Sequence, residues 1–435
     1  MSQLMGQTLR TESGQQCSVE QLLGSGGQGE VYQVRVDNQP LALKWYFPHY
    51  LASDPDLRKR LEDAIKKGSP TDRFLWPLEL VEDPKGHTFG YLMPLREPRF
   101  KSIAGMMKRR VDPSFRALCT AGFELAHNFL ELHIRGLCYR DISHGNVFID
   151  PDTGEVCICD NDNVAVTGTA YGGILGTPRF MAPEIVRGEA HPSTETDLFS
   201  LAVLLFYMFF LHHPLEGKKD AEIHCFDLPA MNKLYGLEPV FIFDPQDTSN
   251  RPVPGLHDNA IIFWQIYPEF LRKLFTRAFT EGVREPENRV RESEWRRAFV
   301  KLRDSIIYCS KCGAENFYDA EKLREAQAHI CWSCNSEIQL PPRIRIGDTV
   351  VMLNHDTKLF PHHLGSDLYN FGAPIAEVVR HPQKPNVWGL RNLSQDTWTV
   401  PEQDGTVSQV HPGKSLTIAL GVEINFGKAK GEIRL

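Results

Sequence analysis

The sequence lacks the features that mark secreted, membrane and nucleic-acid-binding proteins. Its first residues, MSQLMGQTLR, contain no apolar run of the kind that a secretory signal requires. Its longest apolar run, residues 198–211, is too short to span a bilayer and predicts a buried helix instead. The formal net charge of −7 gives no overall basic character for nucleic acid or an anionic membrane surface. We therefore expect a cytoplasmic protein with no membrane span and no nucleic-acid partner.

Internal repeats and low-complexity linkers are absent too, so the expected domain boundaries come from changes of pattern along the 435 residues. Residues 15–95 contain short apolar runs between turn signals and predict a small sheet. Residues 96–305 are mostly helical in pattern. Residues 306–340 carry two close cysteine pairs, and residues 341–435 alternate apolar and polar side chains as an all-β sandwich does. The chain is therefore expected to be of the α+β class, with domains at 1–305, 306–340 and 341–435.

One helix is predicted within the first β-rich zone. Asp54 is its expected N-cap, Pro55 suits the first helical position, and apolar residues then recur every fourth position until Gly68. This helix is expected to pack its apolar face on the sheet.

A glycine-rich stretch, LLGSGGQGEVYQV, contains Gly24, Gly26 and Gly29 in the spacing G-x-G-x-x-G. Glycines let a turn approach phosphate groups and offer them its backbone N–H groups. Alone the pattern is weak evidence, because glycine-rich hairpins are common. Strand patterns flank it on both sides, which differs from the strand-then-helix context of a dinucleotide fold.

Lys44 follows in an otherwise apolar strand, LALKWY. It is either an exposed edge residue or a buried cation held for a phosphate group. Glu62 lies on the predicted helix, and a lysine held by a helix glutamate can bridge two phosphates of a nucleotide. Asp63 is the neighbouring alternative to Glu62.

Polar residues concentrate in YRDISHGNVFID, residues 139–150. Asp141 is suited to accept a proton from a substrate hydroxyl, and the amide oxygen of Asn146 to bind a metal ion. Asp160 comes directly after another apolar strand. A phosphoryl-transfer site needs an orienting carboxylate and two oxygen ligands for Mg²⁺. Each residue alone has an alternative interpretation as a turn residue, since Asp and Asn favour turns.

In this ordered set the sequence resembles the eukaryotic-like Ser/Thr protein kinase family, over roughly residues 15–305. Three further matches support the resemblance: GTPRFMAPE at residues 176–184, Asp197 in TDLFSL, and Arg289 in ENRVRESEW. Asp197 looks like the family's buried aspartate on the central helix, and Arg289 like the arginine that pairs with the glutamate of Ala-Pro-Glu. The resemblance implies a bilobal fold, with a β-rich N-lobe at about 15–95 and a helical C-lobe at about 96–305.

The resemblance implies transfer of the γ-phosphoryl group of ATP to Ser or Thr hydroxyls of proteins, with Mg²⁺ or Mn²⁺. Asp141 would be the catalytic aspartate, Asn146 and Asp160 would hold the metal, and Lys44 paired with Glu62 would anchor the phosphates. Leu92, Met93 and Leu95 would line the adenine pocket, with Pro94 in the hinge, and Val31 and Ala42 would also contact the nucleotide. Arg140 before the aspartate implies control by phosphorylation of the activation segment. The hydroxyls available in that segment are those of Thr167, Thr169, Tyr171 and Thr177.

Three departures from the family pattern bear on activity. The usual Asp-Phe-Gly reads Asp160-Asn161-Asp162, the usual lysine two places after the catalytic aspartate is Ser143, and His144-Gly145 replaces Pro-Glu. They leave two alternatives open: an inactive scaffold that acts through its C-terminal domains, and a small-molecule phosphotransferase. GTPRFMAPE favours a protein kinase, because in the family this segment builds a platform for an extended peptide.

The cysteines of C-S-K-C and C-W-S-C are separated by eighteen residues. Four thiolates at this spacing suit one structural, tetrahedral Zn²⁺ at Cys309, Cys312, Cys331 and Cys334. A redox pair or two disulfides are the alternatives, and a reducing compartment disfavours them. The segment resembles a zinc ribbon.

Residues 341–435 resemble a forkhead-associated domain through L-x-N-x-S and the late pattern from residue 411 to 427. The arginine that reads phosphothreonine in that family would follow Gly347, where this chain has Asp348. A sandwich that no longer binds phosphopeptides is therefore the favoured interpretation. The whole chain resembles signalling kinases of bacterial phosphorylation triads, which implies a von Willebrand A protein and a metal-dependent phosphatase as partners.

Overall fold

A computed structural model of the chain describes the ranges 4–83, 86–168, 175–366, 369–402 and 404–434. The chain forms two compact units. The first consists of Met1–Gln265 and Arg272–Phe299, and the second of Ile266–Leu271 and Val300–Leu435. The unit boundary therefore lies inside α12 (Glu292–Asp304), and the two expected C-terminal domains share one unit.

The β-rich lobe is a closed, six-stranded antiparallel barrel in the order β1-β2-β3-β4-β6-β5. Its strands are β1 (Thr8–Thr11), β2 (Gln16–Ser25), β3 (Gly29–Val36), β4 (Gln39–Tyr46), β5 (Glu79–Glu82) and β6 (Phe89–Pro94). Tyr32, Leu43 and Trp45 belong to the apolar cluster that fills the barrel. The turn from β3 to β4 places Asp37 and Asn38 at positive φ, which matches the right-handed twist of the two strands.

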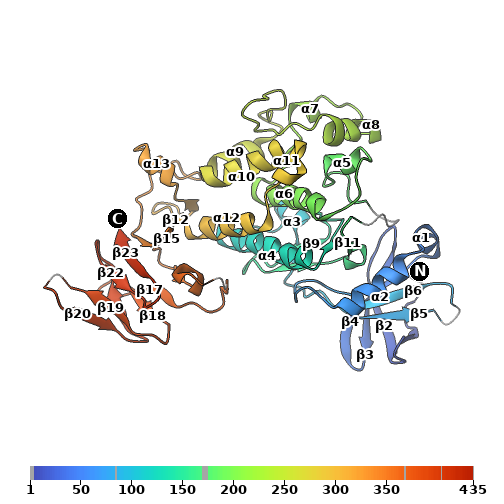
Figure 1. Cartoon of the computed structure of the whole chain (residues 1–435), viewed down its shortest axis with the longest axis horizontal. Helices are drawn as coiled ribbons and strands as arrows, with labels where there is room; N and C mark the ends of the chain where they lie inside the picture. The colour runs from blue at the N-terminus through green and yellow to red at the C-terminus, as the bar shows by residue number, and fades with distance from the viewer. Residues whose placement is uncertain (1–3, 84–85, 169–174, 367–368, 403, 435) are drawn as a thin grey trace. The chain divides into compact units, whose positions relative to one another are not determined.

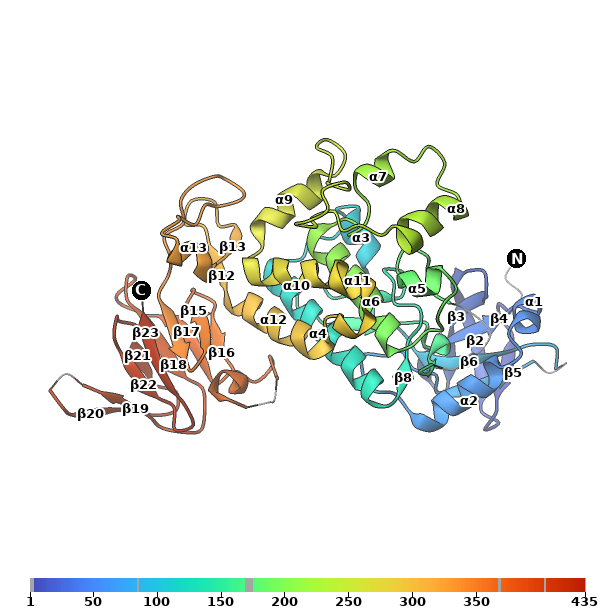
Figure 2. The same cartoon turned by 45° about the horizontal axis from the view of Figure 1, so that its top comes forward.

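Helix α2 (Leu57–Lys67) packs on β4 and β6 through Leu57 and Leu61 (Figures 1 and 2). It ends at Gly68, at φ +72°, as predicted. The predicted N-cap was wrong, because the helix follows Asp56 and the short helix α1 (Pro48–Ser53) precedes it. Asp54 is instead buried.

The helical lobe surrounds α6 (Thr194–Phe210), of which almost every residue is buried, as the apolar run predicted. Phe206 contacts Phe275 edge-on, and Phe209 stacks on Phe299. The other helical elements are α3 (Ile103–Met107), α4 (Phe115–Ile134), α5 (Pro183–Val186), α7 (Lys218–Ala221), α8 (Leu228–Met231), η2 (Asn232–Leu237), α9 (Asp258–Ile266), α10 (Glu269–Phe279), α11 (Glu281–Arg284) and η3 (Pro286–Asn288). In the described part of the chain, no helix has the length and apolar character needed to cross a membrane.

Short strands hold the polar loops of the helical lobe. One small sheet has the order β10-β9-β7 and a second pairs β11 with β8. Their bounds are β7 (Lys101–Ser102), β8 (Leu137–Cys138), β9 (Val147–Ile149), β10 (Val156–Ile158) and β11 (Ala165–Val166). The loop from β8 to β9 carries Asp141 and Asn146, and Asp160 lies in the turn after β10, next to η1 (Asn161–Asn163).

The second unit contains the hairpin of β12 (Ile306–Tyr308) and β13 (Glu315–Phe317), then α13 (Ala320–Arg324) and a β-sandwich. One sheet of the sandwich has the order β15-β14-β23-β22-β19-β20 and the other β16-β17-β18-β21, which agrees with the predicted all-β architecture. The remaining bounds are β14 (Arg343–Ile346), β15 (Thr349–Met352), β16 (Lys358–Leu359), η4 (Pro361–Leu364), β17 (Ala376–Arg380), β18 (Trp388–Asn392), β19 (Trp398–Pro401), β20 (Val407–Val410), β21 (Ser415–Thr417), β22 (Glu423–Asn425) and β23 (Lys430–Arg434).

Candidate active site and cysteine centre

The glycine loop joins β2 to β3. Gly24 pairs with Val31, and the N–H of Gly26 donates to the carbonyl of Gly29 at 2.9 Å. A Cβ at Gly29 would lie 2.0 Å from the carbonyl oxygen of Trp45, so only glycine fits there. Around Gly24 and Gly26 the space is open. Packing does not require glycine at these two positions, whereas close approach to a phosphate group does.

Lys44 on β4 is buried, with 4% of the residue exposed. Its Nζ lies 2.8 Å from Oδ2 of Asp162 and 3.5 Å from Oδ1 of Asp160. Burial by itself would lower the pKa of Lys44, but the two carboxylates outweigh it and raise the pKa. The lysine is therefore held as a buried cation.

The predicted partner of Lys44 was wrong. The Glu62 side chain is 48% exposed, and its Oε1 lies 2.9 Å from Nε of Arg58 on the same helix. Helix α2 turns Arg60 and Leu61 inward, so Glu62 points to solvent. Asp162 occupies the place that was expected for Glu62.

The apolar residues predicted to contact the nucleotide divide between two faces of the barrel. Leu92 belongs to the cluster inside the barrel with Leu43, so its prediction as a pocket residue was wrong. Successive side chains of a strand point to opposite faces, and Leu92 is one residue out of phase with its neighbours. The other four lie in the cluster on the α2 side of the sheet: Val31, Ala42, Met93 and Leu95.

Asp141 and Asn146 are joined directly. The Nδ2 group of Asn146 donates to the backbone carbonyl and to Oδ2 of Asp141, at 2.9 Å each. The amide oxygen of Asn146 is left as its side-chain acceptor. The hydroxyl of Thr177 donates to Oδ1 of Asp141 at 2.7 Å, which fixes the carboxylate from the opposite side.

Asp160 follows β10 in a left-handed conformation, at φ +51°. Non-glycine residues in this region store strain of the kind found at functional sites. Its side chain is 37% exposed and lies near two other carboxylates, those of Asp162 and Asp141. Desolvation raises the pKa of Asp160, and repulsion from the two carboxylates raises it further. The positive charge of Lys44 lowers the pKa, but the net shift is upward. A divalent cation would relieve this repulsion, so the donor set fits a metal ion such as Mg²⁺.

Asp197 of α6 holds the backbone of the catalytic loop. Its carboxylate accepts the N–H of Tyr139 at 2.5 Å and the N–H of Arg140 at 3.0 Å. Arg140 is at φ +75°, a strained conformation that these bonds help to maintain. The predicted buried aspartate of the central helix is confirmed.

Glu184 and Arg289 form the predicted pair. Nη1 and Nη2 of Arg289 lie 2.8 Å from Oε1 and Oε2 of Glu184, a bidentate geometry. Arg289 is 3% exposed and also donates to the carbonyls of Gly282 and Glu195. The pair ties the end of the 176–184 segment to the helical lobe.

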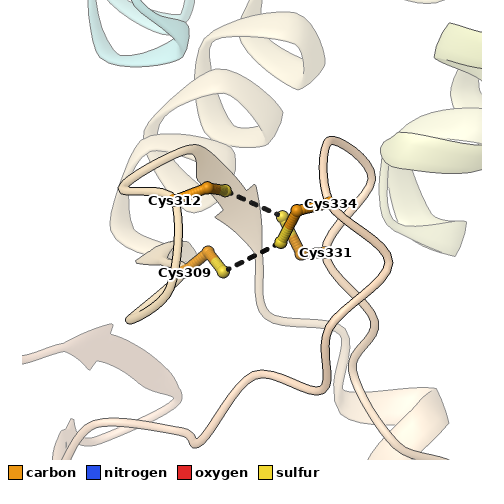
Figure 3. Close-up of side chains that lie close together, drawn as sticks. All are labelled: Cys309, Cys312, Cys331 and Cys334. Atoms are coloured by element: carbon orange, nitrogen blue, oxygen red, sulfur yellow. Dashed lines mark hydrogen bonds between the residues drawn. The ribbon is translucent and has the colours of Figure 1, made fainter.

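The four paired cysteines converge in the second unit (Figure 3). The sulfur atoms of Cys309 and Cys334 are 3.6 Å apart, as are those of Cys312 and Cys331. All four sulfur atoms lie within 4.8 Å of one another. Each C-x-x-C segment forms a tight turn. The N–H of Gly313 donates to the carbonyl of Cys309, and the N–H of Asn335 donates to the carbonyl of Cys331, at 2.9 Å each. Four thiols around one point fit a tetrahedral metal ion.

A second group of ligand-type side chains, Asp304, His362 and His363, also lies in the second unit. The backbone N–H of Phe360 donates to Nδ1 of His363 at 2.9 Å. The proton of His363 is therefore on Nε2, which donates to Asp304 at 3.2 Å. This tautomer makes His363 a hydrogen-bond donor to Asp304 and unsuited to ligate metal through Nε2.

Sequence reasoning missed three contacts of the active site. Tyr46 donates to Asp162 at 2.5 Å, Asp162 binds Lys44, and Thr177 binds Asp141. The sequence signal for Asp162 was its departure from the usual glycine. The sequence predicts Thr177 as an activation-segment hydroxyl within the 176–184 match, and not as a partner of Asp141.

The barrel with its glycine loop, followed by a helical lobe that presents Asp141 and Asn146, resembles the two-lobe arrangement of a protein kinase domain. Residues 119–265 match the family model described as "Protein kinase domain". The match begins in α4 and ends in α9, so it includes Asp141, Asn146 and Asp160 but not Lys44. The match therefore supports the kinase fold through the helical lobe, and the barrel supports it by geometry alone.

Among known proteins, the chain is similar to the DNA damage-responsive serine/threonine-protein kinase RqkA of Deinococcus radiodurans, with 29% identity over 210 residues, 46% of this chain and 31% of that protein. It is 25% identical over 226 residues to the serine/threonine-protein kinase drp72 of Corynebacterium efficiens, covering 50% and 43% of the two chains. PknA of Corynebacterium glutamicum is 24% identical over 211 residues, covering 46% and 44%. The matches span less than half the length of these curated relatives. They support a Ser/Thr protein kinase of a kind found in bacteria.

Proposed function

We propose that this chain is an ATP- and Mg²⁺-dependent protein kinase that transfers the γ-phosphoryl group to Ser or Thr hydroxyls of protein substrates. The observation that supports this most is the network of charges from Lys44 through Asp162 and Asp160, beside the Asp141–Asn146 pair. These are the parts that phosphoryl transfer requires: a phosphate-binding cation, oxygen ligands for a metal, and a carboxylate to orient the hydroxyl.

In the proposed mechanism, Lys44 binds the α- and β-phosphates, and the open backbone at Gly24 and Gly26 lets the glycine loop cover them. Asp160 and the amide oxygen of Asn146 would hold Mg²⁺, which neutralises charge on the phosphates when it is bound. Asp141 orients the attacking hydroxyl and accepts its proton.

Radiolabelled ATP tests the proposal in the full-length protein. We expect the wild type to label itself or a general protein substrate, and Asp160→Ala and Asp141→Asn to give background labelling. Asp152→Asn is the matched control, because Asp152 is an exposed aspartate in the turn between β9 and β10. Equal background labelling by the wild type and Asp160→Ala would instead support an inactive scaffold.

We also propose autophosphorylation in the activation segment, to be located by mass spectrometry of residues 164–180. Two candidate hydroxyls have partners: the Thr167 hydroxyl accepts the N–H of Thr194 at 3.1 Å, and Thr177 is bound to Asp141. Thr169 and Tyr171 lie outside the described residues. Phosphate on a metabolite in cell extract, with none on protein, would favour the small-molecule alternative that His144-Gly145 suggested.

For the second unit we propose one structural Zn²⁺ on the four cysteines and a forkhead-associated-like sandwich that does not read phosphothreonine. Asn392 of the L-x-N-x-S motif is fully buried and donates to the carbonyls of Asp396 and Val410, at 2.8 and 3.0 Å. This motif residue therefore closes its own loop. Fluorescence anisotropy with phosphothreonine peptides tests the proposal, and saturable binding would contradict it. The von Willebrand A protein and the phosphatase stay predictions.

A further inference from the structure

Asp162 lies at the centre of a buried polar cluster between the two lobes of the first unit. Its side chain is 1% exposed. One oxygen, Oδ2, receives both Nζ of Lys44 at 2.8 Å and the hydroxyl of Tyr46 at 2.5 Å. Burying a carboxylate is costly unless it is paired and hydrogen-bonded, and both conditions are met here by residues of β4.

Helix α2 offers Lys44 no carboxylate. The side chains that it buries are Leu57, Arg60, Leu61 and Ala64. Glu62 and Asp63 are exposed. Arg60 is engaged with Asp54 through two hydrogen bonds of 2.8 and 2.6 Å. The inward face of the helix therefore presents a cation in this region, where a helix glutamate was expected.

We propose that Asp162 is the positioning residue that sets Lys44 for the α- and β-phosphates, in place of a glutamate on α2. The proposal rests on the proposed function. Asp162 is two residues after Asp160, so one short turn fixes both the phosphate-binding lysine and the metal-binding carboxylate. Nucleotide anchoring would then be independent of the acidic residues of α2.

If the ion pair of Asp162 and Lys44 had only a structural role, the result would be different. Its loss would lower the stability of the protein and leave the ATP affinity of the folded fraction unchanged. A positioning role predicts a change in the ATP KM and in nucleotide affinity, because a displaced Lys44 loses its contact with the phosphates. The other oxygen, Oδ1, is buried without a hydrogen-bond partner in the described part of the chain. The position of this carboxylate thus depends on Lys44 and Tyr46.

The test compares Asp162→Asn, Asp162→Glu and Tyr46→Phe with the control Glu62→Gln in the full-length protein. We measure the KM for ATP and kcat of phosphate incorporation, the affinity for a fluorescent ATP analogue, and the melting temperature. We expect Asp162→Asn to weaken analogue binding about tenfold or more, as the loss of a charge-assisted bond does. Asp162→Glu should recover part of that loss, and Glu62→Gln should stay within about twofold of the wild type.

Wild-type analogue affinity in Asp162→Asn, or an equal loss in Glu62→Gln, would overturn the inference while leaving the kinase proposal intact. If Asp162→Asn does not fold, Tyr46→Phe decides. That variant keeps the charge pair and removes one bond to Asp162, so weaker analogue binding supports the inference and unchanged binding overturns it. A wild type that binds no analogue and labels no protein would contradict the proposed function itself.

Discussion

Nε2 of His133 lies 3.1 Å from Oδ2 of Asp197, the same oxygen that accepts the N–H of Tyr139 in the catalytic loop. Nδ1 of His133 is hydrogen-bonded to Glu292. Burial alone would lower the pKa of His133, but the hydrogen bonds to Asp197 and Glu292 prevail and raise the pKa to about 9. A buried imidazolium thus supports the aspartate that shapes the active site.

This arrangement predicts that the protein loses stability as the pH rises. The pKa of His133 is higher in the folded state than its ordinary value of 6.5, so the stabilisation is complete below pH 6.5 and is lost as the pH passes through about 9. The wild type should lose up to about 3 kcal/mol of unfolding free energy across this window from this group. Urea unfolding followed by tryptophan fluorescence at pH 6.5 and 9 measures the change.

His133→Gln isolates the contribution of the histidine. The variant should be less stable than the wild type at pH 6.5, and the difference between the two proteins should shrink at pH 9. His127→Gln is the control, because His127 lies on the same helix and its burial lowers its pKa. A difference between wild type and His133→Gln that is equal at both pH values would refute the prediction.

The bidentate pair of Arg289 and Glu184 predicts a large stability effect from a single change. Arg289→Ala leaves Glu184 without its cation and two carbonyls without their donor, and should cost about 3 kcal/mol. Arg291→Ala, at an exposed neighbouring position, should change stability by no more than about 0.5 kcal/mol. A double-mutant cycle with Glu184→Gln measures the coupling, and strict additivity of the two changes would contradict a direct pair.

The sequence predicted best those site residues whose positions depend on local hydrogen bonds. Asp141 and Asn146 lie five residues apart on one loop and bond to each other, so their spacing reflects their geometry. Glu62 directly follows the inward Leu61, and successive residues of a helix point about 100° apart, so the neighbour of an inward residue faces solvent here. The buried Arg60 adds a polar residue to that inward face, which hides it from a pattern of apolar residues.

The barrel was only partly predictable. Its strands β2, β3, β4 and β6 have clear apolar runs, whereas β1 and β5 are four residues each and pair with each other across about seventy positions. Non-local pairing of such short strands leaves little signal in the sequence. The error at Leu92 was avoidable, because strand alternation places Leu92 and Met93 on opposite faces.

Zinc removal tests the cysteine centre. The purified protein should contain about one zinc ion per chain, and Cys331→Ser should abolish it, because four thiolates are needed to close a tetrahedral site. Cys225→Ser is the control, since Cys225 is exposed and lies outside the group of four. Elemental analysis measures the metal, and a chelator should lower the melting temperature of the wild type. Full zinc content in Cys331→Ser would place the metal elsewhere.

Two glycines of the same loop should respond differently to alanine. At Gly29 the new Cβ would lie 2.0 Å from the carbonyl oxygen of Trp45, and a backbone group of a paired strand cannot yield as a flexible side chain does. At Gly26 a Cβ meets nothing within 4 Å. Gly29→Ala should therefore lower the melting temperature, with a cost of about 1–3 kcal/mol.

Gly26→Ala should leave the melting temperature unchanged and weaken binding of the fluorescent ATP analogue, because the methyl group would occupy space that a phosphate group needs. The pair of variants separates the two reasons for glycine in this loop: strand packing at Gly29 and nucleotide approach at Gly26. Unchanged analogue affinity in Gly26→Ala would show that the loop does not contact the nucleotide, and an unchanged melting temperature in Gly29→Ala would show that β3 and β4 can separate to admit a side chain.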